Sequence, residues 1–162
     1  MRRVLRFAVG VLPLLVILSG CSFFGQEEVS YTNWEPQLSP DGTTLVYESP
    51  VDGSLELFTL DLATDVTRQL TDDEVEDWSP VWSPDGTKIV FASIVDKNAD
   101  IYVLDLETLE KTRLTTDEAD DINPDWGTNG LIYFNSNRSD AWEIYSIDPE
   151  SRRLVKITET IE

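Results

Sequence analysis

The chain carries the stretch Pro80-Val81-Trp82-Ser83-Pro84-Asp85-Gly86 near its middle. One copy precedes it, Pro36-Gln37-Leu38-Ser39-Pro40-Asp41-Gly42, and a weaker copy follows it, Pro124-Asp125-Trp126-Gly127-Thr128-Asn129-Gly130. Successive copies start 44 residues apart, because 80 − 36 and 124 − 80 give the same interval. A fixed period of this size is the signature of a repeat architecture, in which each repeat forms one small unit of secondary structure.

Each copy is flanked by short runs of apolar, β-branched and aromatic residues, bounded by Gly, Pro, Asp and Asn. Such runs are typical of strands rather than helices. One run leads into the turn at the end of the motif and three runs follow that turn, so the sequence predicts four strands in each repeat. In the second repeat these are Trp78–Trp82, Ile89–Phe91, Ile101–Asp105 and Thr112–Thr115. The third repeat is one residue shorter, because Leu114 and Ile157 are 43 residues apart whereas Leu70 and Leu114 are 44 apart.

The tetrapeptide Ser83-Pro84-Asp85-Gly86 suits a tight turn between the first two strands. Proline presets φ at the second position, aspartate accepts hydrogen bonds from nearby backbone, and glycine takes a position with positive φ. The third copy has lost the proline but keeps Asn129-Gly130, a strong turn pair. We therefore expect Gly86 at positive φ in a hairpin turn.

The first three runs of each repeat are apolar without clean alternation, which predicts strands buried on both faces, whereas the fourth run is mixed and is expected to face solvent. This decrease in apolar character from the inner strands to the fourth strand fits sheets stacked around an axis, with the outermost strand at the rim. The predicted fold class is all-β, with three four-stranded antiparallel blades of the β-propeller type at about 34–77, 78–121 and 122–162. Four tryptophans of the predicted first strands are expected in the core between blades: Trp34, Trp78, Trp82 and Trp126.

The second repeat resembles the TolB-like β-propeller repeat, also called the WD-40-like or PD-40 repeat. The resemblance rests on the stretch from Trp78 to Gly86 and on the three runs after it, and it extends over about residues 34–158. It is specific for the fold and says little about function, because this propeller serves binding proteins and accessory domains of peptidases. Three blades imply a partial propeller or half of a six-bladed ring.

The resemblance also implies that the first strand of each blade lines a central channel. Asn33, Asp77 and Asp121 hold equivalent positions just before that strand, and they are candidates for binding at the channel. Capping of the local turn is the alternative role for these three residues. Trp142 has no aromatic equivalent in the other repeats and is the candidate for an exposed contact.

Residues 1–20 have the composition of a secretory signal: three arginines precede an apolar stretch from Phe7 to Leu18 that is too short for a membrane-spanning helix. The sequence Leu18-Ser19-Gly20-Cys21 then resembles the bacterial lipobox. The resemblance implies cleavage before Cys21, the only cysteine in the chain, and a lipid on it. An uncleaved anchor or an ordinary signal is the alternative. Residues 21–33 would form a tether, and the expected location is the cell membrane or outer membrane, facing the periplasm or the exterior.

The chain has 12 basic and 31 acidic residues and a formal net charge of −19. This charge argues against binding to nucleic acid or to anionic lipid headgroups. It fits either a solvated surface or a basic partner. Acids gather at 72–77 and at 117–121, in equivalent loops, and hard oxygen ligands at this density could hold Ca²⁺. The spacing is not that of an EF-hand, so we expect no cofactor, with Ca²⁺ as the open alternative.

The chain contains no histidine, no Gly-x-Ser-x-Gly elbow and no phosphate-binding loop, so we expect no catalytic residues and no enzymatic activity. The predicted function is that of a membrane-tethered, non-enzymatic protein-binding or scaffold propeller of the bacterial cell envelope. The expected partner is a protein of the envelope, and a homodimer that completes a six-bladed ring is possible. The alternatives are a truncated or vestigial member of a larger propeller family and an accessory propeller subunit of a periplasmic hydrolase.

Overall fold

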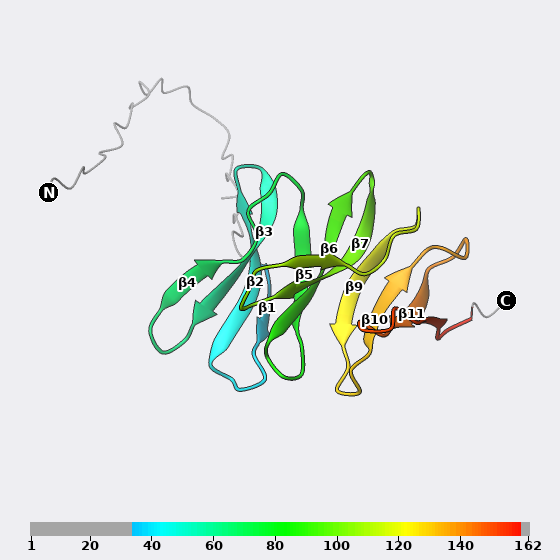
Figure 1. Cartoon of the computed structure of the whole chain (residues 1–162). Coiled ribbons are helices and arrows are strands. Elements are labelled where there is room, and N and C mark those ends of the chain that lie inside the picture. The colour runs from blue at the N-terminus through cyan, green and yellow to red at the C-terminus, as the bar shows by residue number, and fades with distance from the viewer. Residues whose placement is uncertain (1–33, 160–162) are drawn as a thin grey trace, which may run out of the picture. The chain divides into compact units, whose positions relative to one another are not determined.

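The repeats fold into three four-stranded antiparallel sheets, which confirms the predicted fold class (Figure 1). A computed structural model describes residues 34–159 of the chain. Within these residues each strand pairs with its neighbour in the sequence, so every sheet is a simple meander of one repeat. No helix within the same residues is long and apolar enough to cross a membrane.

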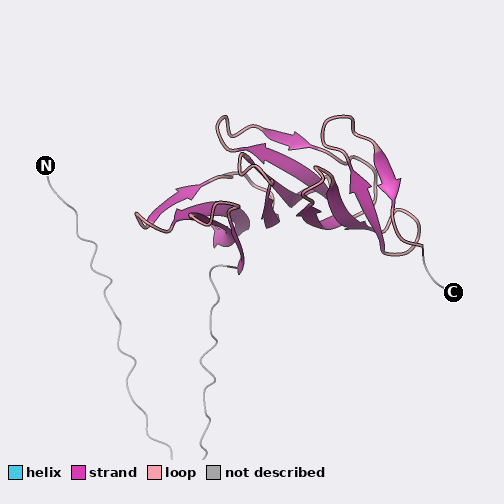
Figure 2. Ribbon diagram, turned by 90° about the horizontal axis from the view of Figure 1, so that it is seen from below, coloured by secondary structure: helices cyan, strands magenta, loops and turns pink. Residues whose placement is uncertain are grey.

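The strands follow the predicted repeats closely. Blade 1 consists of β1 (Trp34–Leu38), β2 (Thr44–Val51), β3 (Ser54–Asp61) and β4 (Val66–Gln69). Blade 2 consists of β5 (Asp77–Trp82), β6 (Lys88–Val95), β7 (Asn98–Asp105) and β8 (Lys111–Arg113). Blade 3 consists of β9 (Asp121–Trp126), β10 (Ile132–Ser136), β11 (Glu143–Ile147) and β12 (Leu154–Lys156). Figure 2 shows the sheets from below, with strands and loops but no helix.

The repeated motif forms the turn between the first two strands of each blade, and the three turns lie at one end of the blades, at the bottom of Figure 1. We call this the turn end. In blade 2 the backbone N–H of Gly86 donates to the carbonyl of Ser83 at 2.9 Å. The carboxylate of Asp85 accepts from the Ser83 hydroxyl at 2.6 Å and from the Thr87 N–H at 3.1 Å. Gly86 has a φ of +73°, as predicted.

Gly86→Val is expected to lower the free energy of unfolding by about 1–3 kcal/mol, because a β-branched residue is forced into the left-handed region. An added Cβ would meet only Pro40 Cδ at 3.7 Å, so the cost comes from backbone strain rather than from a clash. Asp85→Ala removes only local hydrogen bonds and should cost about 1 kcal/mol. Denaturant unfolding of both variants checks the order, and a Gly86→Val midpoint equal to that of the wild type would contradict the turn assignment.

Two apolar clusters join the blades, one between blades 1 and 2 and one between blades 2 and 3. Blade 2 contributes to both, because successive side chains of a strand point to opposite faces. Ile89 of β6 lies in the first cluster and Val90 in the second. The fourth strands, by contrast, are exposed in β4 and β12. The prediction of inner strands buried on both faces and outer strands at the solvent is therefore confirmed for blade 2 and for the rim.

The expectation for the tryptophans was partly wrong. Trp82 is buried in the first cluster and Trp126 packs against the second, as expected. Trp34 is exposed, as is all of β1, because none of the described residues covers the outer face of blade 1. Trp78 is half-buried and belongs to neither apolar cluster; it lines a surface cavity at the edge of the junction between blades 2 and 3. A tryptophan in this motif is thus buried only where a preceding blade lies against it.

Candidate functional site

The residues singled out from the sequence fall into different environments. Asn33 and Cys21 lie outside the described residues, and the predictions about them stay predictions. Asp77 and Asp121 begin β5 and β9, and both side chains are fully buried. Trp142 lies in the hairpin between β10 and β11 and is exposed. Asp77, Asp121 and Trp142 lie at the linker end of the blades, which we define as the end opposite the turns, where the chain passes from one blade to the next.

Asp77 forms an ion pair with a lysine that crosses the face of its own blade. Lys111, at the start of β8, places its Nζ 2.8 Å from Asp77 Oδ2 and 2.7 Å from Asp73 Oδ2. The ammonium also lies 5.3 Å from the ring centroid of Phe91 and 5.6 Å from that of Tyr102. The lysine therefore lies over the aromatic pair of the blade and contacts two carboxylates at once.

Blade 3 repeats this arrangement with a cation from a different place in the blade. Arg138, in the loop after β10, places its guanidinium nitrogens 2.6 Å from Asp121 Oδ2 and 2.8 Å from Asp117 Oδ2. The guanidinium lies 5.8 Å from the ring of Phe134 and 5.0 Å from that of Tyr145. The acids and aromatic rings of blades 2 and 3 are equivalent in the repeat, but the two cations are not. A comparison of repeats alone therefore misses both cations.

Burial sets the electrostatics of the pair in blade 2. It raises the pKa of the Asp77 carboxyl above its ordinary value, against the hydrogen bonds from Lys111 and Ser93. Burial opposes the charge of Lys111 as well, but hydrogen bonds to Asp73 and Asp77 raise its pKa. Asp77 is thus held by an internal cation, which suits an architectural role. Its proposed role at a channel stays a prediction.

A second buried acid recurs in all three blades, and the sequence reading missed it. In each copy the carboxylate at the start of the third strand accepts a hydrogen bond from a threonine hydroxyl 15 residues later, and that hydroxyl accepts the next backbone N–H. The three pairs are Glu56 with Thr71, Asp100 with Thr115, and Glu143 with Thr158. The constant interval of 15 residues between acid and threonine is a sequence signal that could have found them.

One group of carboxylates has the spacing of a cation site. One oxygen from each of Glu56, Asp73 and Asp77 lies within 4.8 Å of the others. The ammonium of Lys111 already contacts two of the three acids, Asp73 and Asp77. A metal ion would have to compete with that internal charge, and the Ca²⁺ prediction for these acidic loops stays a prediction.

An apolar cleft opens at the linker end between blades 2 and 3. It has a volume of about 270 Å³ and is lined by Trp78, Ile94, Lys97, Asn98, Ala99, Asp120, Ile122 and Trp142. We call it the Trp142 cleft. Trp142 also borders an adjoining hollow whose lining includes Glu118, Arg138 and Asp140. Arg138, in the adjoining hollow, pairs with Asp117 and Asp121. Lys97, in the lining of the Trp142 cleft, forms no ion pair within residues 34–159.

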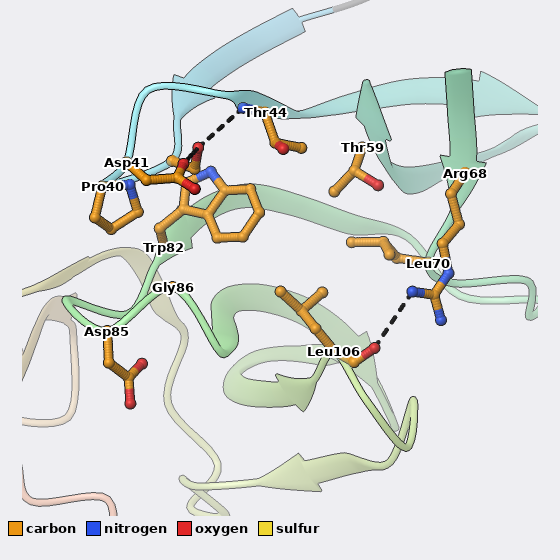
Figure 3. A pocket seen from close by; sticks show the side chains of 11 residues that line it. Pro40, Asp41, Thr44, Thr59, Arg68, Leu70, Trp82, Asp85, Gly86 and Leu106 are labelled. Carbon is orange, nitrogen blue, oxygen red and sulfur yellow. Dashed lines mark hydrogen bonds between the residues drawn. The ribbon is translucent and has the colours of Figure 1, made fainter. Parts of the chain in front are cut away.

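The turn end carries two equivalent pockets, one at each blade junction. The pocket in Figure 3, of about 340 Å³, is lined in part by Ser39, Leu70 and Trp82. The second, of about 460 Å³, is lined by residues shifted by 44 positions, such as Ser83, Leu114 and Trp126. In the first pocket Trp82 Nε1 donates to the Gln37 carbonyl at 3.1 Å, and Arg68 donates to the Leu106 carbonyl at 3.3 Å. These hydrogen bonds join blade 1 to blade 2. The two pockets therefore arise from the way in which successive blades pack, and they are not evidence of a ligand site.

The buried acids predict an unusual dependence of stability on pH. Burial raises the pKa of Glu48, Glu56, Asp77 and Asp100. Between its unfolded and its raised folded pKa, such a carboxyl binds more protons in the folded chain, so the free energy of unfolding grows as pH falls through the folded pKa. Exposed turn aspartates act in the opposite direction. Hydrogen bonding by Lys88 lowers the pKa of Asp105 to about 2, and its contribution is lost as pH falls from about 4 towards that value.

We therefore expect the melting temperature to rise as pH is lowered from 7 to about 5 and to fall again below about 3. Relief of repulsion within a chain of net charge −19 acts in the same direction over the upper range. Calorimetry at several pH values checks the profile. Repeating it in about 1 M salt screens the surface repulsion and leaves the contribution of the buried acids. A melting temperature that falls steadily from pH 7 would contradict the assignment.

Comparisons with known proteins agree with this architecture. A sequence model described as PD40, TolB beta propeller domain, matches residues 79–160. The structure of a putative TolB from Agrobacterium tumefaciens is 29% identical, with a TM-score of 0.71, and the match covers 76% of this chain and 45% of that one. TolB from Acinetobacter baumannii is 23% identical, with a TM-score of 0.68 and coverages of 78% and 32%. A puromycin hydrolase is 26% identical, with a TM-score of 0.64 and coverages of 76% and 21%.

No curated protein matches the chain. The chain spans less than half the length of each of these three solved structures.

Proposed function

This chain belongs to the TolB beta propeller domain family, and from that premise we propose that it is a lipid-anchored, non-enzymatic protein-binding propeller of the bacterial cell envelope. The observation that carries the proposal is the Trp142 cleft. An exposed apolar cleft on a strongly charged domain is typical of a protein interaction site. Tryptophan is among the residues that contribute most to binding energy at such sites.

The charge of the chain indicates the chemistry of the partner. With a net charge of −19, and with Glu118, Asp120 and Asp140 around Trp142, the cleft attracts basic segments and repels acidic ones. Apolar side chains of the partner would pack on Trp142 and Ile94, both of which are exposed. The best fit is a protein segment with apolar residues flanked by lysine or arginine.

The proposal of a lipid anchor is based on the sequence that precedes the blades. The basic start, the apolar stretch Phe7 to Leu18 and the lipobox-like Leu18-Ser19-Gly20-Cys21 support export and lipidation. Cys21 and Trp34 are 13 residues apart, so a tether between them spans at most about 45 Å. The propeller would therefore bind its partner close to the membrane surface.

A non-enzymatic role is supported by the chemistry of the side chains. The chain contains no histidine, and three of its buried acids, Asp77, Asp100 and Asp121, are each bound by a lysine or arginine. A second candidate, an accessory propeller for a hydrolase of the envelope, is favoured by the match to part of a puromycin hydrolase. Both candidates use the propeller as a binding surface, and identification of the partner distinguishes them.

Trp142→Ala tests the binding surface. We expect the variant to lose at least about tenfold in affinity for the envelope partner, because truncation of a central aromatic contact costs more than about 1 kcal/mol. Purification of the full chain from its native membrane, with quantitative mass spectrometry, measures the recovered partner. Val66→Ala is the matched control, because Val66 is exposed on β4, away from the cleft. Equal partner recovery from both variants would rule out the cleft as the binding site.

Cys21→Ala tests the anchor. The variant is expected to leave the membrane fraction or to retain its signal segment, because two or three acyl chains hold a protein firmly only when they are attached. Fractionation and the mass of the N-terminal peptide measure both effects, with Ser22→Ala as the control that keeps the cysteine. Unchanged membrane retention together with an unchanged N-terminal mass in Cys21→Ala would show that this residue carries no lipid.

A further inference from the structure

The outer face of blade 3 has the composition of a blade interface, although none of the described residues covers it. Ile144 is 40% exposed, whereas its counterpart in blade 1, Leu57, is 0% exposed. Ile157 is 51% exposed, whereas its counterpart Leu70 is 6% exposed. In blade 1 these positions pack against the next blade. Blade 3 thus presents the same kind of face as blade 1 does, but no blade within residues 34–159 packs on it.

The outer face of blade 1 is the complementary half. In blades 2 and 3 the equivalent face is buried against the preceding blade. The apolar positions of β2 and β3 on this face correspond to buried positions of blade 2; they are Leu45, Tyr47, Phe58 and Leu60, equivalent to Ile89, Phe91, Tyr102 and Leu104. Leu38 is 54% exposed where the equivalent Trp82 is 9% exposed. An apolar hollow of about 200 Å³ remains on this face, lined by Pro36, Leu45, Tyr47 and Leu60.

We propose that a second copy of the chain covers both faces, with blade 3 of each copy packed on blade 1 of the other. The contact repeats the two interfaces between blades of one chain. In each of these, a face that corresponds to the exposed face of blade 3 packs on the next blade, on a face that corresponds to the exposed face of blade 1. Closed propellers typically have four to eight blades, and two sets of three give six. The two-fold axis then lies along the ring axis, so the two Trp34 residues lie at the same end of the ring.

One polar contact of the internal interface has its counterpart in the proposed one. Between blades 1 and 2 the Ser79 N–H donates to Glu48 Oε2 at 2.7 Å. Asn135 occupies the position of Glu48 in blade 3, and Glu35 occupies that of Ser79 in blade 1. Glu35 and Ser79 share a positive φ, of 49° and 53°, so their N–H groups are presented in the same way. The Asn135 amide oxygen can therefore accept the backbone N–H of Glu35 across the copies.

Sedimentation equilibrium tests the assembly on the full chain in non-ionic detergent and again on the chain from Ser22 onward, which retains the compact unit Tyr31–Glu162. The expected result is a dimer at tens of micromolar. Leu38→Asp and Ile157→Asp should each weaken dimerisation by about 100-fold or more, because each buries an unpaired charge in an apolar interface. Val66→Asp, on the exposed rim, should leave the dimer intact.

Mixing the two disruptive variants provides a second test. Blade 3 of the Leu38→Asp chain and blade 1 of the Ile157→Asp chain are both unaltered, so the mixture should recover a heterodimer held by one intact interface. Circular dichroism confirms that each variant is folded, which is expected because both sites are exposed in the single chain. A monomeric wild type, a dimer that survives either single substitution, or a mixture that stays monomeric would each overturn the head-to-tail assembly.

Discussion

Lys111→Met is expected to lower the free energy of unfolding by about 3 kcal/mol, because breaking a buried ion pair leaves an uncompensated charge inside the protein. Asp77 is fully buried and accepts from Lys111 Nζ at 2.8 Å. Methionine keeps the apolar stem of the side chain on Phe91 and Tyr102 but removes the charge that lies near their rings. The loss is therefore electrostatic rather than one of packing.

Lys88→Met is the matched control for this prediction. Lys88 also pairs with an aspartate at 2.7 Å, but both side chains are about one-third exposed. A surface pair of this kind contributes less than about 1 kcal/mol. Denaturant unfolding at pH 7 should separate the two variants clearly. The difference should shrink on acidification, because protonation of Asp77 removes the unpaired charge. Equal unfolding midpoints for Lys111→Met and Lys88→Met would show that the buried pair adds nothing beyond a surface pair.

The Lys111–Asp77 pair shows which part of the site could not be predicted from the sequence. Asp77 and Asp121 are equivalent in the repeat, and their position at the start of the first strand could be read directly from the spacing. The cations that hold them could not, because Lys111 comes from β8 and Arg138 from the β10–β11 loop. Their counterparts in the other blade are the apolar residues Leu154 and Val95. The two equivalent aspartates are thus paired with cations from different positions of the repeat, and the pairing can be seen only in the packed blade.

The fold itself was predictable because several local signals agree. The 44-residue period, the turn glycine and the apolar runs all indicate four strands per repeat, and Gly86 has the predicted positive φ. Leu38 and Trp82, by contrast, hold equivalent places on first strands but differ in burial, since only Trp82 has a preceding blade against it. Burial of a repeat residue depends on its neighbours in space, which the motif does not contain.

Thr71→Val is expected to destabilise the chain by about 2–3 kcal/mol, because it leaves a buried backbone N–H and a buried carboxylate without their partner. Thr71 Oγ1 accepts from the Leu57 N–H at 2.9 Å and donates to Glu56 Oε2 at 2.6 Å. Valine has nearly the same shape, so no cavity forms. Burial already raises the pKa of Glu56, and without the Thr71 hydroxyl its carboxylate is less stabilised still.

Thr158→Val is the internal comparison, because Thr158 makes the same two contacts in blade 3. Lys156 lies 3.4 Å from Glu143 and can still compensate the charge, and the neighbouring Ile144 is exposed to water in the single chain. The expected cost is therefore about 1 kcal/mol when the chain is monomeric. If a second copy covers blade 3, this cost should grow with protein concentration towards that of Thr71→Val, whereas the cost of Thr71→Val should not change. Chemical unfolding at submicromolar and at high micromolar concentration measures both trends, and a Thr158→Val effect independent of concentration would count against a covered blade 3.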